Sequence, residues 1–221
     1  MNRWHCTDHG VDRRNLLIGV ALAALTPVLM RPVAALAGPS EAEQFVRQLI
    51  EDALAVLRLP VDAKADRRAG FARILEGHFD LDTIARLVVG RYWPKASDEQ
   101  KKNFVRAFRE HIVNVYSSQL GAYQDETVEI KQVIPRDGAD SVVFTEVIRH
   151  GDKPPLRLDW LVRGSDSGFK IIDVAAEGVS MMTTKRAEFA SVIAREGLDG
   201  LIRRLDELNA QVGTDSASSS S

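Results

Sequence analysis

The stretch LRLDWLVR at residues 156–163 alternates apolar side chains with charged or outward-facing ones, and this period of two is typical of a β-strand. Similar patterns lie at residues 126–131, 141–149 and 169–176, separated by short turns rich in Gly, Asp and Ser. Four consecutive strands with short connections predict an antiparallel meander. The last two strands carry apolar residues on both faces, so we expect part of the sheet to be covered on both sides.

Helical periodicity dominates the chain before and after these strands. Apolar residues recur at helical spacing in five segments, at about residues 40–59, 64–77, 81–90, 97–120 and 184–207. Ser40 and Ser97 each open a capping box, and Gly197 predicts a break in the last segment. Helices segregated from a run of strands in this way predict the α+β class.

The composition is that of a globular protein. The 221 residues are 45% hydrophobic and 27% charged, with 29 Lys and Arg against 31 Asp and Glu. This mixture excludes a disordered or fibrous chain. The near-neutral balance also argues against nucleic-acid binding, which normally requires a basic excess.

The first 37 residues predict a cleaved signal peptide. Arg13 and Arg14 precede the apolar run 16–25, which is too short for a comfortable transmembrane helix, and Ala35-Leu36-Ala37 supplies a cleavage site. An uncleaved anchor is the alternative, and the arginine pair leaves the Sec and twin-arginine routes both open. Because Cys6 is the only cysteine, cleavage would leave a periplasmic chain with neither a disulfide nor a lipidated cysteine.

Catalytic motifs are absent from the sequence. The histidines that follow the leader, His78, His111 and His150, lie on three different elements without metal-ligand spacing. Asp80 and Asp82 near His78 could form an acid/base or metal site, although carboxylates at a helix N-terminus are the commoner reason for such a cluster. Ser180 near Asp173 lacks a base and is more typical of a cap. The sequence therefore predicts neither an enzyme nor a metal or cofactor site.

Several ordered segments carry a resemblance to a known family. They are Gly90–Trp93, Phe104–Glu110 with Tyr116 and Tyr123, Pro155–Trp160, Asp173–Lys185, Glu188–Phe189 and Gly197–Leu201. Together they resemble the MlaC, or toluene-tolerance, family of periplasmic phospholipid-binding proteins, including its hopanoid-associated branch. The resemblance covers about residues 71–205, and residues 38–65 match only in helical character.

The resemblance implies an α+β fold in which a four-stranded antiparallel sheet and about six or seven helices enclose an apolar lipid cavity. It also implies a monomeric carrier that shuttles phospholipid between an outer-membrane lipoprotein complex and an inner-membrane ABC transporter with an MCE-domain subunit. A hopanoid carrier, a lipid-modifying enzyme and a peptide-binding chaperone are the alternatives. The expected organisation is a signal peptide at 1–37, one lipid-binding domain at 38–207 and a disordered tail at 208–221.

The expected lipid-binding residues come from the long helix, the strands and the turn after the fourth strand. Alternation selects Leu158 and Trp160 most directly, and Met181 and Val179 are expected to line or gate the cavity because they follow Gly178 at the end of the sheet. The full set is Phe104, Phe108, Ile112, Phe144, Leu158, Trp160, Ile172, Val174, Val179 and Met181. Each of these residues could instead be ordinary core.

Overall fold

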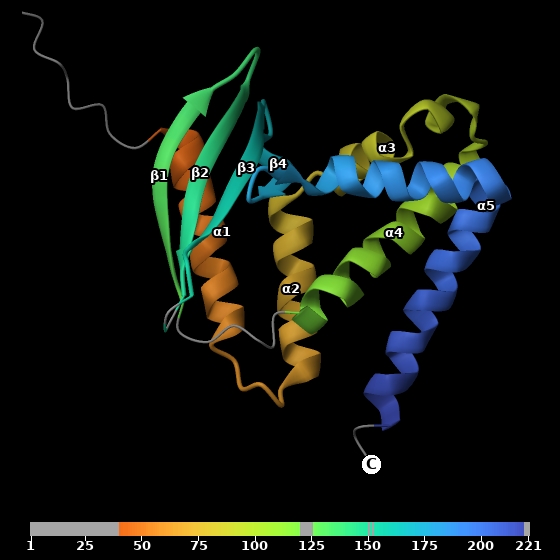
Figure 1. Cartoon of the computed structure of the whole chain (residues 1–221), viewed down its shortest axis with the longest axis horizontal. Coiled ribbons are helices and arrows are strands. Elements are labelled where there is room, and N and C mark those ends of the chain that lie inside the picture. Colours follow the sequence, from red (N-terminus) through yellow and green to blue (C-terminus); the bar gives the residue numbers. More distant parts are fainter. Residues whose placement is uncertain (1–39, 120–125, 150, 152, 219–221) are drawn as a thin grey trace, which may run out of the picture. The chain divides into compact units, whose positions relative to one another are not determined.

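The computed structural model describes residues 40–119, 126–149, 151 and 153–218. The leader at 1–37, Tyr123 and His150 lie outside the described residues. The elements, in chain order, are α1 (Glu41–Leu57), α2 (Lys64–His78), α3 (Leu81–Val89), the 3-10 helix η1 (Gly90–Lys95), α4 (Asp98–Gln119), β1 (Thr127–Pro135), β2 (Asp140–Ile148), β3 (Leu156–Ser165), β4 (Gly168–Ala176), β5 (Val179–Ser180) and α5 (Met181–Ser218) (Figure 1).

The strands form one antiparallel sheet in the order β1-β2-β3-β4-β5, which confirms the α+β class and the predicted meander. The sheet has five strands rather than the four expected. Glu177 and Gly178 adopt positive φ angles of 50° and 79°, and this tight turn returns the chain so that Val179 pairs with Ala176. A strand of two residues is too short to show any periodicity in the sequence.

A β-bulge explains why β4 is apolar at consecutive positions. Trp160 pairs with Val174, but the register then shifts, so that Val162 pairs with Ile171 and Ile172 is the extra residue. By alternation, Ile171 and Ile172 therefore lie on the same side of the sheet, where they are 0% and 3% exposed. The apolar run in β4 thus follows from a bulge and does not require cover on both faces.

The helices cover one face of the sheet. Helix α1 packs against β1, β2 and β3 (Figure 1). Its buried side chains Val46, Leu49 and Ile50 share a core cluster with Val143 and Ile171 of the sheet. The opposite face carries Phe144 and Leu161, which are half-buried.

A second core joins α3, α4 and α5. The rings of Phe104 and Phe108 stack with centroids 5.6 Å apart, and Phe189 of α5 meets both edge-on at 6.0 and 6.1 Å. Asn209 reinforces this junction from α5, because its amide accepts a hydrogen bond from Asn114 and donates one to the carbonyl of Ala107.

Helix α5 consists of two arms that meet at Gly197, which has φ 73° and ψ 175° (Figure 1). This kink confirms the predicted break. The second arm continues to Ser218, whereas the sequence predicted a disordered tail from residue 208. Leu205 and Asn209 are 2% and 5% exposed, so the helix is anchored beyond the point where its sequence becomes polar. Across the described part of the chain, no helix is both long and apolar enough to cross a membrane.

Candidate functional site: an apolar cavity between sheet and helices

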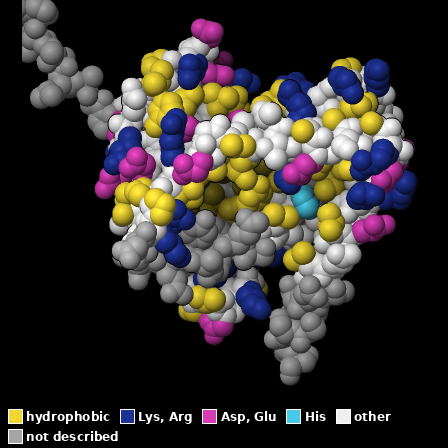
Figure 2. Space-filling model, viewed as in Figure 1, with side chains coloured by type: hydrophobic (Ala, Val, Ile, Leu, Met, Phe, Trp, Pro, Cys, Tyr) yellow, Lys and Arg dark blue, Asp and Glu magenta, His cyan; other side chains and the backbone are white. Residues whose placement is uncertain are grey.

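The sheet and the helices enclose a cavity of about 450 Å³. Hydrophobic side chains form the visible wall of the hollow (Figure 2). Among the described lining residues only Glu126, Asp173 and Lys185 carry charge. The size lies in the range of small-molecule sites, but the wall has far fewer polar groups than a site that must orient a polar substrate.

Strands β3 and β4 supply most of the sheet side of this wall, and Val128 of β1 and Val147 of β2 complete it. Leu158 and Trp160, the two residues that alternation selected, line the cavity together with Leu156. Their cross-strand neighbours also line it, with Trp160 opposite Val174 and Leu158 opposite Ala176. A period of two, repeated in adjacent strands, therefore produces a continuous apolar surface.

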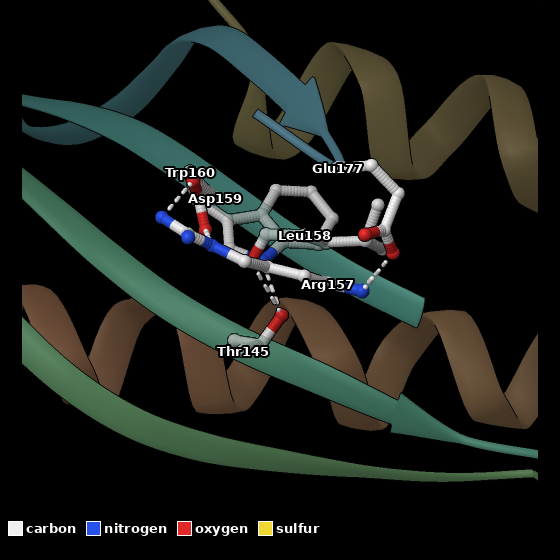
Figure 3. A network of polar contacts seen from close by, with 6 residues as sticks. All are labelled: Thr145, Arg157, Leu158, Asp159, Trp160 and Glu177. Carbon is white, nitrogen blue, oxygen red and sulfur yellow. Dashed lines mark hydrogen bonds and ion pairs between the residues drawn. The ribbon is translucent and has the colours of Figure 1, made fainter. Parts of the chain in front are cut away.

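A hydrogen bond to Thr145 satisfies the polar atom of Trp160 in this apolar surface. The indole Nε1 of Trp160 donates to the hydroxyl of Thr145 at 3.0 Å, and that hydroxyl donates to the carbonyl of Leu158 at 2.9 Å (Figure 3). Thr145 is only 1% exposed, so water cannot replace it readily as the acceptor. The sequence analysis missed Thr145; its position between the inward-facing Val143 and Val147 was the available signal.

Polar contacts hold the outer face and the end of β3. Arg157 forms a two-pronged ion pair with Asp159 at 2.8 and 2.7 Å (Figure 3). The backbone N–H of Arg157 donates to the Glu177 carboxylate at 2.7 Å, and the Glu177 N–H donates to the Arg157 carbonyl at 3.0 Å. These two bonds tie the strand that carries Leu158 to the turn before β5.

Seven of the ten candidate residues lie together in the cavity wall. They are Phe108, Ile112, Leu158, Trp160, Ile172, Val174 and Met181. Whether they contact lipid remains a prediction.

The other three candidates lie outside the lining. Phe104 is 0% exposed and packs in the core between Trp93, Phe108 and Phe189. Phe144 faces the other side of the sheet, where the guanidinium of Arg157 lies 5.0 Å from its ring centre. Val179 is 62% exposed in the two-residue strand β5, beside the lining residue Met181.

The first three helices supply much of the wall, although none of their residues was among the ten candidates. The residues are Leu49, Ile50, Ala53, Leu54 and Leu57 of α1, Phe71, Ile74 and Leu75 of α2, and Leu81, Ile84 and Val88 of α3. In the sequence these residues form the apolar stripes of three helices. Such a stripe looks the same whether the helix packs against other side chains or borders a cavity.

One end of the wall is polar. Lys185 lines the cavity, exposes 24% of its side chain and pairs with Glu188 at 2.7 Å. Burial, together with the Lys185 charge, lowers the pKa of the nearby His111, and burial, together with the Glu188 charge, raises the pKa of Tyr116. His111 is therefore neutral and Tyr116 protonated near pH 7.

The candidate catalytic clusters have structural roles. Asp80 caps α3, accepting a hydrogen bond from the Thr83 N–H at 2.9 Å, while His78 bonds Asp52 at 2.8 Å. Ser180 accepts from the Thr183 N–H and donates to Asp173 at 2.6 Å. No group of three or more His, Cys, Asp or Glu within the described ranges could hold a metal ion.

The chain matches the family model for MlaC protein over residues 47–207. It belongs to the MlaC family. This confirms the resemblance seen in the strand and long-helix segments. The MlaC match covers most of the described residues, including every element that lines the cavity.

Two MlaC-like proteins are similar over much of the chain. The intermembrane phospholipid transport system binding protein MlaC of Haemophilus influenzae is 24% identical over 137 residues, which is 61% of this chain and 64% of that protein. The chain thus spans somewhat less than two thirds of this relative. A phospholipid-binding protein from Ralstonia solanacearum, solved in complex with a phospholipid, superimposes with a TM-score of 0.68 at 27% identity, covering 79% of this chain and 99% of that one.

Proposed function

We propose that this protein is a phospholipid carrier of the periplasm, which holds the acyl chains of its cargo in the cavity between the sheet and the helices. The observation that carries the proposal is the wall itself, which among its described residues is apolar except for Glu126, Asp173, Lys185 and the hydroxyl of Tyr116. The proteins to which the chain is similar are named for phospholipid binding and transport, in agreement with this reading.

The energetics of transfer explain why such a wall suffices. Each methylene removed from water contributes about 0.8 kcal/mol, so about 30 methylenes of two acyl chains require shelter worth on the order of 20 kcal/mol. Aliphatic and aromatic side chains provide that shelter without any reactive group. We therefore propose that the protein is a carrier rather than an enzyme. A carrier of this kind needs no metal or cofactor.

The route of the cargo is proposed from the resemblance to the MlaC family. The N-terminal leader at 1–37 would direct the chain across the inner membrane. In the periplasm a monomeric carrier would exchange phospholipid between an outer-membrane lipoprotein complex and the MCE-domain subunit of an inner-membrane ABC transporter.

Charge on α4 would assist the encounter with the MCE-domain subunit, but only weakly. Lys101 pairs with Asp98, Arg106 with Asp206 and Arg109 with Asp82, so much of the basic character is neutralised within the protein. Lys101→Glu combined with Lys102→Glu should slow association with the MCE-domain partner at low salt without changing lipid content. Association that is equally fast across the salt range would remove this part of the proposal.

Lipid extraction tests the carrier proposal directly. Purified protein should release nearly stoichiometric phospholipid, identified by mass spectrometry. Recovery of a hopanoid would favour the hopanoid-associated branch of the family. Recovery of lysolipid with free fatty acid would favour an enzyme. Protein that contains no lipid and takes none up from vesicles would contradict the proposal.

A further inference from the structure

Lys185 brings a positive charge to the cavity wall. Of the lining residues within the described chain, it alone is cationic. Its side chain is 24% exposed, so it reaches both the apolar interior and water. A residue at this boundary would meet the part of a lipid that joins the acyl chains to the polar head group.

The partner of Lys185 places a negative charge beside the positive one. Glu188 lies one turn further along α5, with its Oε2 2.7 Å from the Lys185 Nζ, and exposes 51% of its side chain. An ammonium group has three donors, so Lys185 can bind an additional anion while it keeps Glu188. The pair thus places a carboxylate directly beside the one cationic lining residue, on a side chain that is half exposed and is not itself part of the described lining.

His111 and Tyr116 beside this pair add no charge near pH 7, whereas Asp173 adds one negative charge to the wall. His111 is held neutral and Tyr116 protonated by their burial and by the charges of Lys185 and Glu188 respectively. The Asp173 carboxylate is already engaged by the Ser180 hydroxyl and by the backbone N–H groups of Val174 and Met182. The charge of an incoming head group would therefore be balanced mainly by Lys185 and Glu188.

We propose that Lys185 and Glu188 form a head-group site that selects a zwitterionic phospholipid. The Lys185 ammonium would donate to a phosphodiester oxygen, and the Glu188 carboxylate would accept from the cationic amine of the same head group. A head group with only negative charge would satisfy Lys185 but meet repulsion from Glu188. This inference rests on the proposed function, since it assumes that the cavity holds lipid chains.

A competition experiment tests the selection. Delipidated protein is incubated with vesicles that contain equal amounts of phosphatidylethanolamine, phosphatidylglycerol and diacylglycerol with identical acyl chains, and the bound lipids are quantified by mass spectrometry. We expect the wild type to prefer phosphatidylethanolamine over both competitors. In Lys185→Gln the ratio of bound phosphatidylethanolamine to bound diacylglycerol should fall about tenfold, because one charge-assisted hydrogen bond is lost.

Two further variants and a control complete the test. Glu188→Gln should shift the preference toward phosphatidylglycerol, and Lys185→Arg, which keeps the charge, should retain the wild-type ratio to diacylglycerol. Lys102→Gln on α4 removes an exposed lysine and should leave every ratio unchanged. Lys185→Gln with a wild-type ratio, or Glu188→Gln without a shift, would overturn the inference. A wild type that loads none of the three lipids would instead contradict the proposed function.

Discussion

The indole of Trp160 and the hydroxyl of Thr145 form a hydrogen bond of 3.0 Å between the adjacent strands β3 and β2. Because Trp160 lines the cavity, its N–H group would otherwise lie against apolar surroundings without an acceptor. Thr145 removes that penalty, and its own hydroxyl donates a hydrogen bond to the Leu158 carbonyl. The wall can therefore contain a large ring whose polar atom is hydrogen-bonded within the sheet.

Replacing Thr145 by Val tests this relationship. The variant keeps the shape of the side chain but leaves the Trp160 N–H without its acceptor, so we expect a loss of about 1–3 kcal/mol in the free energy of unfolding. Urea unfolding of delipidated protein measures it without a contribution from bound lipid. Adding Trp160→Phe to Thr145→Val should recover part of the loss, and strictly additive effects would show that the hydrogen bond contributes nothing.

A carboxylate placed in the cavity wall should exclude lipid. Leu158→Glu puts a charge among apolar side chains, so co-purified phospholipid should fall several-fold while the fold is retained at a cost of a few kcal/mol. Leu161→Glu is the matched control, because Leu161 lies on the opposite face of the same strand. Equal lipid content in the two variants, measured after extraction, would contradict the assignment of Leu158 to the cavity.

The kink in α5 should depend on glycine at position 197. With φ 73° and ψ 175°, Gly197 occupies a backbone region that residues with a Cβ rarely adopt, so Gly197→Ala should cost about 1–3 kcal/mol of stability. An added Cβ meets no atom within 4 Å, which excludes a steric clash as the cause. Gly77→Ala is the control: the added Cβ is equally unobstructed but lies within α2, so stability should rise by up to about 1 kcal/mol. Equal effects in thermal unfolding would argue against strain at the kink.

His111 should make stability depend on pH below neutrality. Its pKa is lowered in the folded state, chiefly by burial, relative to about 6.5 in the unfolded chain. Below that value the unfolded state binds more protons at this residue, so its contribution to stability is complete above pH 6.5 and is lost as the pH falls through the folded-state pKa. His111→Leu should therefore show a smaller decrease in unfolding free energy between pH 7.5 and 5.5 than the wild type. Parallel pH profiles for the two proteins would refute this.

Local patterns in the sequence predicted the elements well. Ser40 and Ser97 accept hydrogen bonds from the Glu43 and Gln100 N–H groups, each at 3.1 Å, which is the serine half of each predicted capping box. The Gln100 side chain also returns to the Ser97 N–H at 3.0 Å. These contacts join residues three apart, so their geometry follows from the helix itself and needs no knowledge of the remaining chain.

The division between core and cavity could not be predicted in the same way. Phe104 and Phe108 are four residues apart on one helical stripe, yet only Phe108 lines the cavity. Phe144 belongs to an apolar strand but lies on its outer face, where it packs under Arg157. Periodicity predicts which side of a helix or strand is apolar. Whether a residue on that side is buried in the core or lines the cavity depends on which other elements pack against it.

The sequence by itself determined the α+β class, the antiparallel order of the strands, the break at Gly197 and the face of β3 that carries Leu158 and Trp160. Those features depend on side-chain alternation, capping and backbone freedom, all of which act over a few residues. Only the tertiary structure decided that helices α1 to α3 and the sheet leave a cavity between them, and that Lys185 lies in its wall. Both outcomes depend on distances between elements far apart in the chain, and an apolar stripe has the same sequence whether another side chain or a cavity lies opposite it.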